Sequence, residues 1–139
     1  MDPLEISSLT IAARELIDKD GAEAYVINTF PKVKVESAKF LRSANPDSEL
    51  HGGERETAKV LASRPDLVRP ERAEPFVSER LLEAKRIGMQ MDHWLDMKEY
   101  SPMGYMGNPK VATPETGEAV YNIEVEEIVK FVKALKATM

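Results

Sequence analysis

Apolar residues recur at helical spacing close to the start of the chain and again at its end. Near the start, Ser7 or Ser8 can cap a helix and Gly21 can end it. The apolar positions between them are Leu9, Ala12, Ala13, Leu16 and Ile17. Near the end, Thr113 can cap a helix whose first residue is Pro114. The apolar stripe of that helix consists of Val125, Ile128, Val129, Val132 and Leu135.

A short, nearly continuous apolar run follows the first of these helices. Residues 24–28 include Tyr25, Val26 and Ile27, as expected of a strand covered on both faces in a parallel sheet. A helix followed by a buried strand is half of an α/β unit. The sequence therefore predicts an α/β fold with a mainly parallel sheet. Residues 29–50 read as a loop, in which Val33 and Val35 alternate with lysines and permit a short edge strand.

Two shorter helices are predicted in the middle of the chain. One precedes Pro65 and places apolar residues at Ala58, Val60, Leu61 and Ala62. The other begins at Ser78, a suitable cap, and extends to Ile87. Residues 69–76 between them are charged and rich in proline, which indicates a surface connection.

A loop rich in proline, glycine and tyrosine follows at residues 100–109. Gly104 and Gly107 permit tight turns, so this loop is expected to be ordered. The run Met89–Met97 before it contains His93 between Asp92 and Asp96, the composition of a metal site. Its methionines and Trp94 are typical of a packed interface or core, and we favour packing over ligation there.

The stretch Glu49–Thr57 holds the chemistry of most interest. It gathers one of the two histidines, two adjacent glycines and three carboxylates. Gly52 and Gly53 can bring the backbone close to a ligand, and His51 and Glu56 can face one cavity as a pair for proton transfer or metal binding. The alternative is structural, because a carboxylate in the first turn of a helix also complements the helix dipole. The residues alone leave both readings open.

Composition narrows the classes of function. At 139 residues the chain is long enough for one domain, 1–139. Nineteen basic and 24 acidic side chains give a net charge of -5, which offers no footprint for nucleic acid or an anionic membrane. There is no cysteine and no signal peptide pattern, so a cytoplasmic protein without disulfides is expected.

Two separate stretches resemble the creatininase family of amidohydrolases. Residues 51–68 are similar to its His-Ala/Gly-Gly-x-x-Glu-Thr stretch, with the short helix and Pro-Asp/Glu-Leu-Val element that follow. Residues 104–117 are similar to its Gly-x-x-Gly-Asp-Pro-x-x-Ala-Thr-x-x-x-Gly stretch, except that Asn108 stands where the family usually has Asp. The chain corresponds to the C-terminal half of a usual member.

The resemblance implies a partial three-layer α/β/α fold completed by a partner chain, which would be a second subunit carrying the N-terminal half, or else a homo-oligomer. It also implies a divalent metal, Zn, Mn or Fe, shared with that partner, since the family's metal-binding histidine loop has no counterpart at residues 1–5. On this pattern His51 is catalytic, Gly52 and Gly53 bind substrate, and Glu56 contributes to the metal site.

The implied activity is hydrolysis of a small cyclic amide or formamide by a metal-activated water. The alternative is a non-catalytic structural or regulatory subunit derived from this fold, which the absent histidine loop and Asn108 favour.

Overall fold

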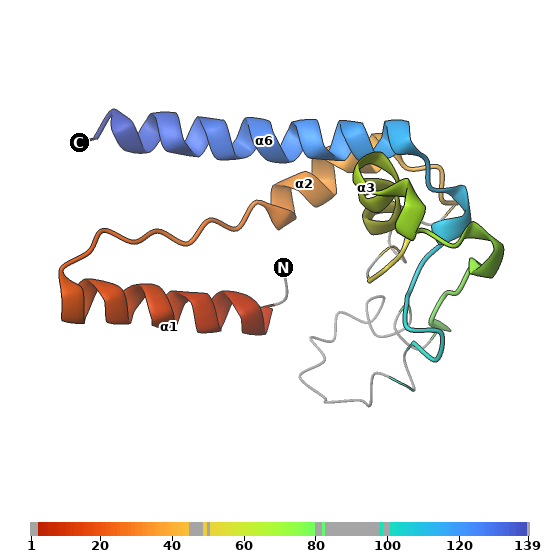
Figure 1. Ribbon diagram of the computed structural model, residues 1–139, viewed down its shortest axis with the longest axis horizontal. Helices are drawn as coiled ribbons and strands as arrows, with labels where there is room; N and C mark the ends of the chain where they lie inside the picture. Colours follow the sequence, from red (N-terminus) through yellow and green to blue (C-terminus); the bar gives the residue numbers. More distant parts are fainter. Residues whose placement is uncertain are drawn as a thin grey trace. The chain divides into compact units, whose positions relative to one another are not determined.

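The computed structural model describes residues 3–44, 49, 51–79, 82, 98 and 101–138 (Figure 1). It divides into two compact units. The first unit comprises Met1–Glu36 with Glu124–Met139, and the second comprises Ser37–Ile123. The α-helices are α1 (Pro3–Asp20), α2 (Phe30–Ser37), α3 (Glu54–Ser63) and α6 (Pro114–Lys136). Short 3-10 turns lie at η1 (Ala38–Phe40), η3 (Pro65–Leu67), η4 (Pro70–Arg72) and η5 (Pro109–Val111).

The predicted N-terminal helix is confirmed as α1, but it begins at Pro3. Ser7 and Ser8 therefore lie inside the helix, and the prediction that one of them caps it is wrong. Pro3 is well suited to the first turn, because its missing N–H would have no partner there and its φ is already helical. Gly21 ends the helix as predicted, with a φ of 62° that a side chain would disfavour.

The predicted strand at residues 24–28 is wrong for the described chain. These residues form an extended segment with no strand pairing, which Figure 1 shows returning from the end of α1 toward α2. The Tyr25 ring instead packs edge-on against Phe131 of α6, with the ring centroids 6.3 Å apart. A strand needs a neighbour for its backbone groups, and none of the described residues supplies one here. The mainly parallel sheet stays a prediction.

The predicted edge strand at Val33 and Val35 is also wrong, because these residues lie in α2. The Asn28 side chain accepts the Phe30 N–H at 3.1 Å, in the manner of a cap. Val33 is 1% exposed whereas Val35 is 75% exposed. Burial recurs at Ser37, four residues after Val33, so the buried positions follow the helical period rather than the strand period.

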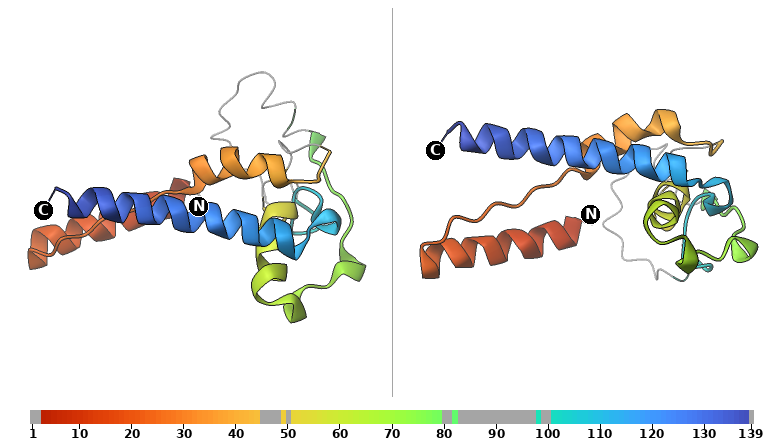
Figure 2. Two further views of the ribbon diagram at one scale, coloured as in Figure 1. Left: turned by 90° about the horizontal axis from the view of Figure 1, so that it is seen from above. Right: turned by 45° about the horizontal axis from the view of Figure 1, so that its top comes forward.

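In the second unit, α3 crosses the start of α6 (Figures 1 and 2). Ala58 of α3 and Val120 of α6 are completely buried. Gly117 lies at the crossing, where an added Cβ would be 2.0 Å from the Ala58 carbonyl oxygen. The two backbones can approach this closely only because position 117 has no side chain. This crossing fixes α3, and therefore the stretch that precedes it.

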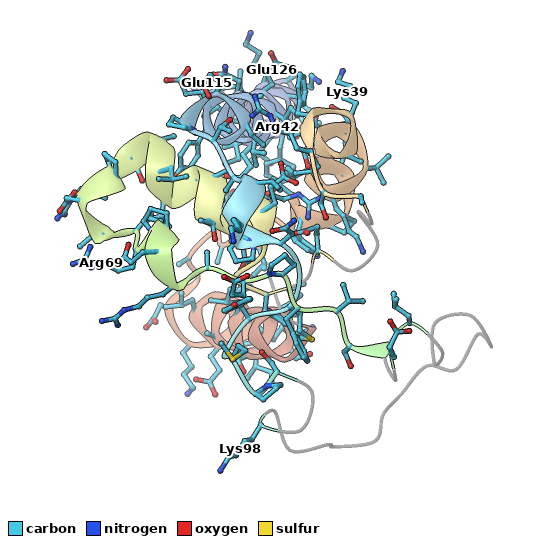
Figure 3. All side chains as sticks on the ribbon, turned by 90° about the vertical axis from the view of Figure 1, so that its right-hand side faces the viewer. Lys39, Arg42, Arg69, Lys98, Glu115 and Glu126 are labelled. Carbon is cyan, nitrogen blue, oxygen red and sulfur yellow. The ribbon has the colours of Figure 1, made fainter. Side chains whose placement is uncertain are left out.

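The start of α6 agrees with the sequence prediction. The Thr113 hydroxyl accepts the Thr116 N–H at 3.3 Å, and Pro114 is the first helical residue. Hydrogen bonds from its own backbone N–H and from Thr113 lower the pKa of the Glu115 carboxyl, with a smaller contribution from Arg42, which lies near it in Figure 3. A carboxylate at this position also complements the helix dipole.

The connection from residue 64 to residue 79 contains the turns η3 and η4 and then forms an isolated antiparallel bridge between Phe76 and Gly107. Gly104 and Gly107 both have positive φ, as expected of the ordered loop predicted there. Most of the predicted helix from Ser78 to Ile87, and the whole run Met89–Met97 with His93 and Trp94, lie outside the described residues. Among the described residues, no helix is long and apolar enough to cross a membrane.

Candidate functional site

His51 lies in the bend that leads into α3, and its side chain is exposed. Its carbonyl oxygen accepts the Met106 N–H at 2.6 Å, which holds the bend against the loop of residues 104–108. Within the part of the chain that the structure describes, no hydrogen bond or ion pair involves the imidazole. The backbone of His51 is therefore fixed while its side chain stays available to a ligand.

The carboxylate of Glu56 turns back to the residue after His51. One oxygen, Oε2, accepts the Gly52 N–H, and the side chain is otherwise exposed in the first turn of α3. This contact resembles the reach of a glutamate to the N–H groups that precede a helix. The hydrogen bond from Gly52 supports a structural role for Glu56. The other carboxylate oxygen, Oε1, has no hydrogen bond among the described residues.

The two glycines are required by packing within the chain. An added Cβ at Gly52, whose φ is 61°, would lie 2.8 Å from the Cβ of Tyr105. An added Cβ at Gly53 would lie 2.2 Å from Oε2 of Glu49. The Gly52 N–H is already bonded to Glu56, and Gly53 is buried. These contacts explain both glycines without a ligand, and substrate binding by them stays a prediction.

Two of the three carboxylates in the stretch Glu49–Thr57 are buried, and no role was predicted for either of them from the sequence. Glu49 is 1% exposed and Glu54 is 0% exposed. Glu54 accepts the backbone N–H groups of Arg42 and Ser43, both at 2.7 Å. Glu49 accepts the N–H of Glu54 and, at 2.8 Å, that of Asn108. One sequence signal for Glu49 was available, because Gly53 stands at the cap position of α3 and has no side chain to accept a helix N–H.

Arg55 supplies the positive charge beside these carboxylates. Its side chain is buried, and its Nε donates to the Ser37 hydroxyl at 2.8 Å. Burial lowers the pKa of Arg55, while the charges of Glu49, Glu56 and Glu54 oppose that shift. The cluster thus places one buried cation beside two buried carboxylates, which lowers the cost of burying their negative charge.

Asn108 has a structural role in the loop of residues 104–108. Its Oδ1 accepts the Lys110 N–H at 3.2 Å and so caps η5. A carboxylate could accept the same bond, and so can an amide oxygen. The loss of charge at this position therefore leaves the turn intact.

The described residues do not form a metal centre by themselves. Across residues 3–44, 51–79 and 101–138, together with the isolated described positions, no three His, Asp or Glu side chains lie where they could hold a metal ion. The oxygens of Glu49 and Glu54 accept backbone N–H groups. Glu56 has no two further His, Asp or Glu side chains near it among the described residues with which to hold a metal ion. The divalent metal implied by the resemblance does not fit these residues without further ligands.

Comparison with known proteins agrees with the two motif stretches. The creatininase family model, described as creatinine amidohydrolase, matches residues 5–132. The chain therefore belongs to the creatininase family.

A crystal structure of a Bacteroides fragilis protein assigned to the creatinine amidohydrolases matches with a TM-score of 0.55 at 22% sequence identity. The match covers 86% of this chain and 46% of that one. At this identity it shows a shared α/β fold, and this chain spans less than half the length of that protein. A search of the curated proteins finds no match.

Proposed function

We propose that this chain forms the C-terminal half of a metal-dependent amidohydrolase that hydrolyses a small cyclic amide or formamide. In this proposal another chain supplies the main metal ligands. The observation that carries it is the exposed imidazole of His51, presented on a loop whose neighbouring carboxylates are bonded to backbone N–H groups. An exposed polar group on a rigid frame is the arrangement that a binding or catalytic site requires.

His51 would hold or protonate the substrate. An imidazole can donate a hydrogen bond to an amide carbonyl, or a proton to the nitrogen that leaves when the C–N bond breaks. Glu56 would bind the metal through Oε1, or bond to a ligand of that metal. The Zn, Mn or Fe ion itself would lie mainly on ligands of the partner half.

Exposed apolar surface in the first unit supports a partner. The buried core of this unit is small, because Val33 is the only buried apolar side chain among its described residues. The exposed large apolar residues on α1 are Leu9, Ile11, Leu16 and Ile17, and those on the second half of α6 are Val125, Ile128, Val129, Phe131 and Val132. Burying such a surface is favourable by about 25 cal/mol per Å². A second subunit with the N-terminal half would cover it, and a homo-oligomer is the alternative.

A non-catalytic structural or regulatory subunit is the second candidate. It is favoured by the buried carboxylates, which serve the backbone, and by the missing group of metal ligands among the described residues. This candidate explains Glu56, whose carboxylate accepts an N–H group at the start of α3, but it does not explain the exposed His51.

Native mass spectrometry with metal analysis distinguishes the two candidates. The protein is purified from its own cells through a tag on this chain. We expect a second subunit and about two metal ions per pair, as a dinuclear hydrolase site requires. Recovery of this chain alone, or of a metal-free homo-oligomer, would exclude the catalytic proposal and leave the structural one.

A further inference from the structure

Glu49 lies where the two motif stretches of the second unit meet. Its Oε2 accepts the N–H of Glu54, the first residue of α3. Its Oε1 accepts the N–H of Asn108, 59 positions further along the chain, at 2.8 Å. A single buried carboxylate therefore joins the start of α3 to the loop of residues 104–108.

Both stretches leave room for this carboxylate. An added Cβ at Gly53 would lie 2.2 Å from Oε2 of Glu49, and one at Gly107 would lie 2.5 Å from the same oxygen. Gly107 also has a φ of 130°, which side chains disfavour. Glycine thus stands on each side of the Glu49 carboxylate, one in each motif stretch.

Glu49 also does the work of a helix cap. The cap position itself is Gly53, and no side chain there accepts an N–H of α3. A carboxylate at a helix N-terminus is favoured by the helix dipole, and hydrogen bonds to a charged acceptor are stronger than neutral ones. Because the site is buried, water cannot replace a lost contact easily.

His51 lies in the sequence between Glu49 and Glu54, which are joined by the hydrogen bond from the Glu54 N–H to the Glu49 carboxylate. Its carbonyl oxygen is bonded to Met106 in the same loop that Glu49 reaches. We propose that Glu49 is a positioning residue, whose carboxylate fixes residues 51–53 against the loop of residues 104–108 and so holds in place the backbone that carries the His51 imidazole. The catalytic consequence rests on the proposed function, whereas the ordering of the loop does not.

The test compares two buried carboxylates with similar burial and different partners. Glu49→Gln leaves an amide that can accept one N–H but turns its own NH₂ toward the other donor. We expect hydrogen exchange at the Glu54 and Asn108 amides to become about tenfold faster or more, with lower backbone order at His51 measured by NMR relaxation. If Glu49→Gln does not fold, Glu49→Asp keeps the charge, is one methylene shorter and makes the same comparison.

Glu54→Gln is the matched control. Glu54 is fully buried and also accepts two backbone N–H groups, but these belong to Arg42 and Ser43. It should speed exchange at residues 42 and 43 and leave the order at His51 unchanged. Equal loss of order at His51 in both variants would overturn the proposal, because Glu49 would then act through general stability alone.

Kinetics of the complete assembly add a second measurement. Glu49→Gln should lower kcat about 10-fold to 100-fold with little change in KM, since a misplaced catalytic group affects mainly the chemical step. Glu54→Gln should change kcat far less. If the wild-type assembly hydrolyses no cyclic amide or formamide, the proposed function fails, and the exchange comparison still decides the role of Glu49.

Discussion

Replacing His51 with alanine should lower turnover by the complete assembly about 10²-fold to 10⁴-fold, the range typical of losing a general acid or base. The structural cost should be small, because the imidazole is exposed and makes no hydrogen bond in the described chain. The hydrogen bond from Met106 goes to the His51 backbone and survives the substitution. The measurement is kcat and kcat/KM on the purified assembly, with creatinine as the first cyclic amide tried.

Lys110→Ala is a suitable control for this experiment. Lys110 is exposed on η5, and its 3.4 Å ion pair with Glu74 is of a kind that contributes little stability. The kcat of the assembly with Lys110→Ala should equal that of the wild-type assembly. If His51→Ala keeps full turnover while metal content and assembly are normal, His51 has no catalytic role.

The Gly117→Ala substitution should lower the free energy of unfolding by about 2–3 kcal/mol, because overpacking a close contact costs that much. The added Cβ would lie 2.0 Å from the Ala58 carbonyl oxygen and 2.9 Å from the Cβ of Ala62. Backbone cannot turn aside as a flexible side chain can, so α3 and α6 would have to separate. Urea unfolding measures the change as a shift in the midpoint.

The sign of this effect is informative. In an isolated helix, alanine would be favoured over glycine by about 1 kcal/mol. Glu118→Ala, at the neighbouring exposed position, should change stability by less than about 0.5 kcal/mol. A Gly117→Ala variant as stable as the wild type would contradict the close crossing of α3 and α6.

The sequence predicted helices where several local signals agree with one another. α6 has a capping threonine, a proline in its first turn and a regular apolar stripe, and all these signals are local. α2 was missed because Val33 and Val35 alternate with lysines, a pattern that also fits a strand. Only the burial of Val33 and Ser37, four residues apart, selects the helix. The strand at residues 24–28 was predicted from apolar composition. Strand pairing depends on a neighbouring strand, and the sequence of this segment does not determine whether one lies beside it.

The candidate site was predictable only in part. The stretch around His51 and the loop at residues 104–108 stand out in the sequence, and the structure brings them together through the Met106 to His51 hydrogen bond. The role of Glu54 and the long-range contact of Glu49 were not predictable, because these N–H groups come from residues 42, 43 and 108. Nothing local marks a glutamate as the acceptor of distant backbone donors.

Reconstitution of turnover tests the central claim most directly. If a second chain copurifies as proposed, it is isolated separately, loaded with metal and assayed on cyclic amides and formamides with and without this chain. We predict hydrolysis by the mixture and none by either component alone, with activity rising until the two are equimolar. Full activity of the partner without this chain, or no turnover by the mixture, would contradict the claim that this chain completes an amidohydrolase.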